Sequence, residues 1–211
     1  FGRQGARPVS VGDAQKRARS VGTLAPGDSR PVPGVYLYAG TGQDKLSLPP
    51  LSQAQGPTMP ATVAITDGAA CWSLRIDYST HHWQTWQFCR QGSDLVQTAG
   101  QFWQVWNVGP LAITNLTTLT CNPASMMLPA WPAAGQSWPT GCSGSSSAVK
   151  GTMQNSGTLR YLGPVPMTVG GRAVTAEHFV ETMTDQGAQR GTEGYETWLA
   201  PGSGLPLRLR V

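Results

Sequence analysis

The sequence predicts a mainly β protein, a curved antiparallel sheet or incompletely closed half-barrel with a short N-terminal helix and a disulfide-closed loop. From residue 35 onward, short runs rich in Val, Thr, Trp, Tyr and Phe are separated by clusters of Gly, Pro, Asn and Ser. None of these runs alternates with a long helical pattern, which favours an antiparallel sheet. The 26 Gly and 17 Pro among 211 residues, with 12% charged residues, exclude a helical bundle and a coiled coil.

Two regions are expected, a basic N-terminal arm over residues 1–33 and a single β domain over residues 34–211. Ser10 and Asp13 have the spacing of a capping box, and apolar residues at helical spacing follow, which predicts a short helix. Residues 1–30 carry six basic and two acidic groups, whereas the rest of the chain is neutral. We therefore expect the arm to be a solvated segment and expect no nucleic-acid binding by the body.

The candidate strands are bounded by turn residues and enriched in residues that favour β structure. In chain order they are Val35–Ala39, Ala61–Thr66, Cys71–Tyr78, His82–Cys89, Leu95–Thr98, Phe102–Asn107, Leu111–Cys121, Ala148–Gln154, Thr158–Leu162, Ala173–Met183, Gly194–Leu199 and Leu205–Val211.

The segment around Ser79 and Thr80 has the pattern of a β-hairpin. Even positions before the turn are apolar and odd positions are mostly polar, and the run after the turn also alternates. A three-residue loop, 79–81, sets Trp72 opposite Phe88, Leu74 opposite Trp86, and Cys71 opposite Cys89. A two-residue loop would set apolar side chains opposite polar ones. The register thus predicts a Cys71–Cys89 disulfide.

The other two cysteines, Cys121 and Cys142, then pair by elimination. The Pro- and Trp-containing segment between them, 122–141, is expected to form a compact loop lying on the sheet. No CxxC pair is present, so disulfides are favoured over a zinc site, and neither a metal nor a cofactor is predicted.

Catalytic motifs are weakly represented. The string Gly141–Ser145 lacks the final glycine of a nucleophile elbow, and no P-loop, GxGxxG opening a helix or HExxH occurs. The neighbouring residues His81 and His82 point to opposite faces of a strand, which argues against one shared metal. We expect His81 in the turn, His82 at the sheet margin and His178 on the inner face, where it would be a core residue or line a cavity.

The acidic residues do not form a pattern typical of a glycosidase. Glu177 and Glu181 share one strand face and are expected to face solvent, while Glu193 and Glu196 are expected to flank a turn. No pair is set at the separation that glycoside hydrolysis needs.

Several features suggest an exported protein. The first methionine is Met59, which suggests that an N-terminal targeting segment has been removed, and four cysteines suggest an oxidising compartment. No run of 18 apolar residues occurs. We expect an extracellular or cell-envelope location, with membrane proximity, and an anchor where there is one, through the removed segment.

The C-terminal segment from Thr192 to Leu209 carries a strand that ends in Trp198, a turn, and Gly204-Leu205-Pro206-Leu207-Arg208 at the start of the last strand. This segment resembles the final hairpin of LolA-like and LppX-like envelope lipoprotein and lipid carriers. The segment from Val169 to His178 is similar to their strand after a Gly-Gly turn. The whole chain is also similar to uncharacterised actinobacterial proteins that are exported or membrane-anchored. The resemblance implies an incompletely closed barrel around an apolar cavity.

The eight tryptophans and this resemblance lead to a functional expectation. We expect a non-catalytic envelope module that binds an apolar or lipid-like ligand on a concave, aromatic-lined sheet face. The alternatives are a hydrolase acting on envelope glycans or esters, and a structural ectodomain that binds an envelope protein partner through the face bearing Arg75 and Trp83. The expected ligand-contacting residues are Trp72, Leu74, Ile76, Trp86, Phe88 and His178.

Overall fold

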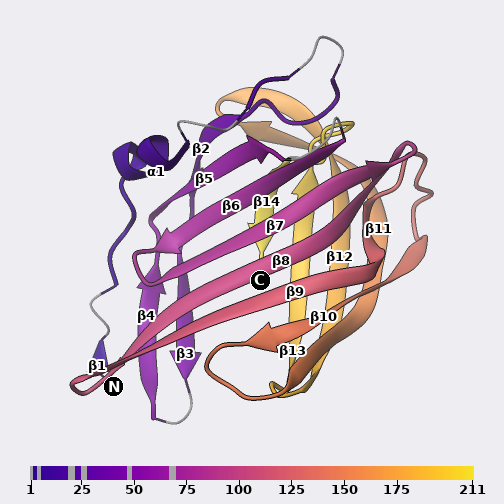
Figure 1. The fold of residues 1–211 in the computed structure, drawn as a ribbon. Helices are drawn as coiled ribbons and strands as arrows, with labels where there is room; N and C mark the ends of the chain where they lie inside the picture. The colour runs from indigo at the N-terminus through magenta and orange to yellow at the C-terminus, as the bar shows by residue number, and fades with distance from the viewer. Residues whose placement is uncertain (1, 4–5, 19–21, 25–27, 47–48, 67–69) are drawn as a thin grey trace.

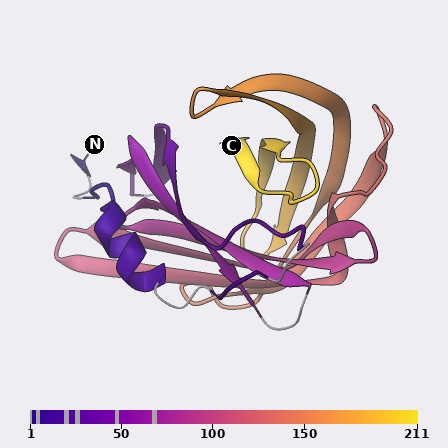
Figure 2. The ribbon, with the colours of Figure 1, turned by 90° about the horizontal axis from the view of Figure 1, so that it is seen from above.

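A computed structural model describes residues 2–3, 6–18, 22–24, 28–46, 49–66 and 70–211, and within these ranges the chain is mainly β-strand. Eleven strands form one sheet that curls into a half-barrel (Figures 1 and 2), which confirms the predicted fold class. Its strands are β2 (Gly34–Ala39), β5 (Thr58–Ile65), β6 (Cys71–Ser79), β7 (His82–Gln91), β8 (Asp94–Val108), β9 (Leu111–Leu128), β10 (Ser137–Ser146), β11 (Thr152–Val169), β12 (Arg172–Gly187), β13 (Gly191–Leu199) and β14 (Pro206–Arg210).

The strands of the large sheet are ordered as they occur in the chain. From β5 to β14 each strand pairs antiparallel with the next, and β2 lies at the other edge beside β5. The chain between β2 and β5 adds the hairpin β3 (Gly42–Leu46) and β4 (Leu51–Gln55), to which β1 (Gly2–Arg3) pairs in a small second sheet. Neither β3 nor β4 was predicted, because their residues are mostly polar and do not alternate.

The half-barrel has a seam between its two edge strands. β2 and β14 are not paired as neighbours, but the Tyr38 hydroxyl on β2 donates a hydrogen bond to the Pro206 carbonyl on β14. Leu205 and Leu209 pack on the same apolar cluster as Tyr36 and Tyr38. Side chains therefore bring the two edges together where no backbone ladder joins them.

The hairpin β6–β7 has the predicted register. Cys71 lies opposite Cys89 and forms a disulfide with it, and Trp72 lies opposite Phe88. A bulge between Asp77 and Ser79 shifts the register near the turn, so the connection itself is the two residues 80–81. Because the bulge adds one residue to β6, the apolar residues of β6 and β7 still lie opposite each other, as they would with the predicted three-residue loop.

The disulfide Cys121–Cys142 is also confirmed, but the loop expected between these cysteines is wrong. β9 continues to Leu128 and β10 begins at Ser137, so only residues 129–136 connect them. β10 pairs with β9 over residues 143–146 alone, and before Cys142 it pairs with β11 only. The disulfide thus lies where β9 and β10 diverge. The Ser- and Gly-rich sequence of β10 concealed the strand.

Two strands that were expected to be interrupted are continuous. β8 passes through Gly100 and β11 passes through Gly157, where the sequence had suggested breaks. Gly157 is required by a close approach of backbones, because a Cβ at this position would lie 2.1 Å from the carbonyl oxygen of Thr182 on β12. Here a glycine inside a strand indicates a close approach of the neighbouring strand's backbone and not a turn.

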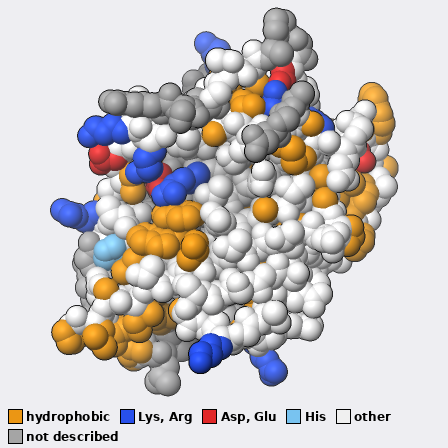
Figure 3. Space-filling model, viewed as in Figure 1, with side chains coloured by type: hydrophobic (Ala, Val, Ile, Leu, Met, Phe, Trp, Pro, Cys, Tyr) orange, Lys and Arg blue, Asp and Glu red, His pale blue; other side chains and the backbone are white. Residues whose placement is uncertain are grey.

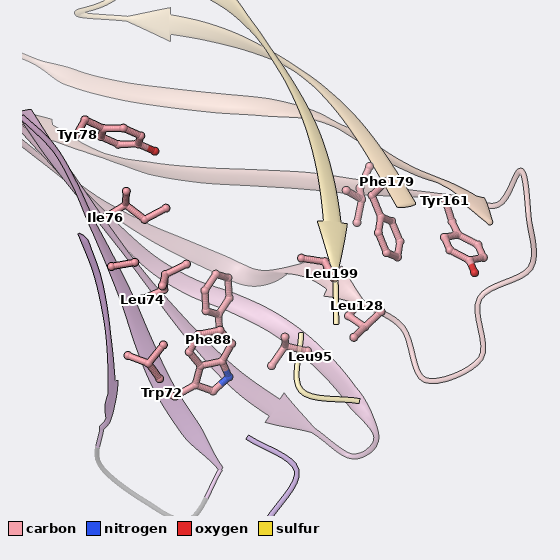
Figure 4. Close-up of a cluster of buried hydrophobic side chains, with 13 residues drawn as sticks. Trp72, Leu74, Ile76, Tyr78, Phe88, Leu95, Leu128, Tyr161, Phe179 and Leu199 are labelled. Carbon is pink, nitrogen blue, oxygen red and sulfur yellow. The ribbon is translucent and has the colours of Figure 1, made fainter. Parts of the chain in front are cut away.

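The main core fills one part of the half-barrel and joins both of its walls (Figure 4). Trp72 is fully buried and its ring lies 4.7 Å from that of Phe88, centroid to centroid. On the curled half, the rings of Tyr161 and Phe179 lie 4.9 Å apart, and Leu199 is fully buried. Both walls contribute large apolar side chains, so the curl is held by burial of apolar surface.

In the N-terminal arm, most described side chains between residues 6 and 18 are exposed, and a few of them contact the sheet. The helix α1 (Val11–Arg17) has the predicted cap, with the Asp13 amide donating to the Ser10 hydroxyl. Ala14 is fully buried, and Arg17 forms an ion pair with the buried carboxylate of Asp77 on β6. In the described part of the chain, no helix has the length and apolar character needed to cross a bilayer. The two disulfides indicate an oxidising, extracellular environment.

Candidate functional site

The concave side of the half-barrel holds a cavity of about 220 Å³ between its two walls. The first wall contributes apolar side chains from β6 to β9, and the second contributes them from β11 to β14. The first set includes Leu74, Ile76, Trp86, Phe88, Phe102 and Leu119; the second includes Leu159, Phe179, Met183, Leu199 and Leu209. These residues lie on the inner face because the strands alternate and the sheet curls.

Four of the predicted ligand-contacting residues line this cavity, namely Leu74, Ile76, Trp86 and Phe88. Trp72 lies on the same face but is fully buried in the core. It packs beneath Phe88 and is not among the residues that line the cavity. The hairpin pattern therefore predicted correctly which side chains point to the inner face. It could not separate core residues from cavity-lining residues, because that boundary depends on the curl of the sheet.

His178 lies on the opposite face of β12 from the cavity, which corrects its expected inward position. Its ring stacks on Trp198 with 4.5 Å between centroids, and its Nε2 lies 3.0 Å from a carboxylate oxygen of Glu196. The same carboxylate accepts a hydrogen bond from Arg210. His178 was assigned inward because Val174 and the other even residues of this segment are apolar, whereas the true inner face of β12 includes carboxylates.

Three carboxylates line the cavity instead. Glu181 and Asp185 project from β12, and Glu193 projects from β13. Glu193 lies opposite Met183, the β12 residue midway between Glu181 and Asp185. The expectation that Glu181 faces solvent is wrong, and Glu193 lies within a strand and not beside a turn. Tyr195, opposite Glu181, donates a hydrogen bond of 2.6 Å to Glu193.

The cavity shifts the acidity of these groups. Burial raises the pKa of Asp185 to about 6, and the charge and hydrogen bond of Glu193 add to the rise. Burial also raises the pKa of Glu181, although the nearby Thr140 hydroxyl acts in the opposite direction. The pKa of Tyr195 is raised well above its ordinary value by burial and by Glu193. Each shift favours the neutral form, since the surroundings solvate charge poorly.

His82 provides a polar group on the first wall. It is 5% exposed, and its Nδ1 lies 3.0 Å from the Asp44 carboxylate on β3. Gln53 and Gln55 also donate to Asp44, so β3 and β4 hold the imidazole from outside the large sheet. The amide nitrogen of Gln55 also lies 3.0 Å from Nδ1, so this nitrogen has both a carboxylate acceptor and an amide donor beside it. Nε2 is buried and has no hydrogen-bond partner.

The polar groups gather toward one end of the cavity. Gln104 pairs with His82 across β7 and β8, and Asn115 pairs with Gln104 across β8 and β9. Asn115 accepts a hydrogen bond from Ser146 at the end of β10, and this end of β10 pairs with the start of β11. Asn155 near the start of β11 lies opposite Asp185 of β12, so polar groups of both walls lie toward the same end. The cavity is amphipathic, with an apolar end beside the core and a polar end away from it.

Around His82 the described residues do not assemble a serine triad. A triad needs a hydroxyl at the second nitrogen of the histidine, and Nε2 of His82 has no partner among them. Among the described residues, no three His, Cys, Asp or Glu side chains are grouped as a metal site would need.

A second hollow lies on the convex face, between the N-terminal arm and the start of β7. Arg75 stacks over Trp83 at 4.1 Å, and Trp83 stacks on Trp103 with 6.0 Å between centroids. Arg7 and Arg17 also line this hollow. Figure 3 shows basic and apolar side chains next to each other on this face.

In comparisons with protein-family models, curated proteins and solved structures, nothing matches this chain. The resemblance of the C-terminal hairpin to envelope carriers therefore stays a prediction. The function has to be argued from the geometry of the site.

Proposed function

We propose that this protein is a non-catalytic binding module of the cell envelope that holds an apolar, lipid-like ligand inside the half-barrel. The observation that carries this proposal is the cavity of about 220 Å³ lined from both walls by apolar and aromatic side chains. Concave sites with mostly apolar walls and a few convergent polar groups are typical of small-molecule binding. The resemblance of the C-terminal hairpin to lipid carriers supports the same conclusion.

Trp86 and Trp83 offer a matched test, because both lie on β7 but on opposite faces. The probe is N-phenyl-1-naphthylamine, an apolar dye whose fluorescence rises on binding. Trp86→Ala removes an aromatic side chain from the cavity wall, so we expect the dye to bind about tenfold more weakly. Trp83→Ala changes the convex face, and binding should stay within about twofold of the parent.

Thermal unfolding of both variants keeps the test informative. Phe102→Leu, a milder change in the same wall, replaces Trp86→Ala if that variant unfolds. Equal dye affinity in the lining variant and in Trp83→Ala would contradict the proposal, as would absence of dye binding to the parent. Native mass spectrometry of protein purified from its source should further show a stoichiometric extra mass that organic solvent extracts.

The second candidate is an ectodomain that binds a protein partner through the convex hollow. The stacked Trp83 and Trp103, with Arg75 above Trp83, form the aromatic and Arg-bearing surface that is common at interfaces. Loss of a copurifying partner in Trp83→Ala, with dye binding intact, would favour this candidate.

A further inference from the structure

The cavity carries an unbalanced charge. Glu181, Asp185 and Glu193 line it, and the described residues of its lining include neither lysine nor arginine. Ion pairs elsewhere in the molecule use arginine for Asp28, Asp77 and Glu196. The carboxylates of the cavity therefore differ from those outside it, since no lysine or arginine among the described lining residues balances them.

This arrangement costs folding free energy. Carboxylates that approach one another repel when ionised, and the strand register sets Glu193 diagonally between Glu181 and Asp185 on the cavity face. Titratable groups held in such surroundings are concentrated at functional sites. A positive charge placed between them would remove the repulsion and supply the missing partner.

An independent observation on the other wall points to a polar group on the ligand. His82 is more than nine-tenths buried and lines the cavity, with Nδ1 beside Asp44 and Gln55. Its Nε2 is a buried polar atom without a partner among the described residues. An unpaired buried polar group is costly, and a polar group brought by a ligand would satisfy it. A carboxylate ligand would add a further negative charge beside Glu181, Asp185 and Glu193.

We propose that the cavity binds a cationic amphiphile, whose protonated amine lies at the polar end against Asp185 and Glu193 and whose hydrocarbon chain lies along Trp86, Phe88 and Phe179. This inference rests on the proposed function and specifies its ligand class. The ammonium group donates hydrogen bonds to both carboxylates, and the chain covers the apolar end of the cavity.

The test compares three amphiphiles of equal chain length as competitors of N-phenyl-1-naphthylamine, each below its solubility limit or micelle concentration: dodecylamine, dodecanol and dodecanoate. At pH 7.5 we expect dodecylamine to displace the dye at a concentration about tenfold lower than dodecanol, the size expected for one hydrogen bond to a charged group. Dodecanoate should be the weakest competitor, because its charge has the sign of the cavity.

Glu193→Gln and Asp185→Asn locate the preference within the cavity. Each keeps the shape of the side chain and removes its charge, so the preference for dodecylamine over dodecanol should fall to about twofold or less. Glu196→Gln is the matched control, since Glu196 lies on the same strand as Glu193 but binds His178 and Arg210 outside the cavity. This control should retain the full preference.

The outcomes separate the two proposals. Equal displacement by dodecylamine and dodecanol would overturn the cationic ligand class while leaving the apolar binding function standing. Failure of all three amphiphiles to displace the dye would overturn both. Equal loss of preference in Glu196→Gln and Glu193→Gln would show that the charge effect is general and would overturn the assigned site.

Discussion

Asp185 illustrates how a single residue can contribute to the pH dependence of stability. Its pKa is raised from 3.8 to about 6 in the folded chain, by burial first and by Glu193 second. Between about pH 4 and pH 6 the unfolded chain has lost this proton while the folded chain retains it. The folded state binds more protons in this window, so stability falls as the pH rises through it and then stays lower.

Asp185→Asn should therefore stabilise the protein at pH 7.5 but not at pH 4. Because the side chain is partly exposed, we expect a gain of about 1 kcal/mol at pH 7.5, less than the full pKa shift implies. Urea unfolding at the two pH values measures it, with Glu196→Gln as a control outside the cavity. The same change in stability at both pH values would contradict the linkage.

At the scale of single residues, alternation located most of the first cavity wall. Leu74, Ile76, Trp86 and Phe88 follow from the hairpin register, because their inner faces are apolar and their outer faces are mostly polar. The acidic part of the site could not be found in this way. The inner face of β12 carries polar side chains, so its hydrophobic pattern is the reverse of the usual one. The sequence prediction followed the usual pattern and therefore placed His178 inward and Glu181 outward.

At the scale of elements, β9 and β10 depend on their disulfide. They pair over only four residues of β10, and the Cys121–Cys142 bridge lies next to that short ladder. Ser125 provides a further link, since its hydroxyl both accepts from the Gly141 amide and donates to the Gly141 carbonyl. The disulfide and the hydrogen bonds of Ser125 therefore hold β9 and β10 together where their backbones diverge.

Replacing both Cys121 and Cys142 by alanine should lower the free energy of unfolding by about 3 kcal/mol on the chain-entropy model. Because Cys142 lines the cavity, dye affinity should fall as well. The matched control is the double alanine variant of Cys71 and Cys89, a bridge of similar span inside a fully paired hairpin. That control should lose similar stability and keep dye affinity. Unchanged dye affinity in both variants would contradict a role for the β9–β10 divergence in shaping the cavity.

The elements that the sequence predicted well are those with strong alternation, such as β6 and β7. β10 was missed because its Ser and Gly residues have low β propensity, and its place in the sheet is fixed by β11 and by the disulfide. Gly100 and Gly157 were interpreted as breaks, although close strand contact explains Gly157. Such contacts depend on partners distant in sequence, which local patterns do not contain.

At the scale of the whole molecule, the seam between β2 and β14 depends on Tyr38. Tyr38→Phe removes its hydrogen bond to Pro206 and should cost about 1 kcal/mol of stability. Amide hydrogen exchange should become faster in β14 while β8 and β9 stay protected. Tyr36→Phe is the control, because that hydroxyl bonds to the nearby Val32 carbonyl. Equal acceleration of exchange in β14 by both variants would contradict the role of Tyr38 at the seam.

The chain-order arrangement of the sheet has a consequence for how the protein is made. From β5 to β14 each strand finds its partner in the segment synthesised just before it, so the sheet can grow hairpin by hairpin as the chain emerges. At every stage the newest strand is an open edge that could pair with another molecule. The last edge, β14, carries Arg208 and Arg210, both held over the ring of Trp198, and charged edge residues discourage such pairing. These charges thus protect the β14 edge against pairing with another molecule.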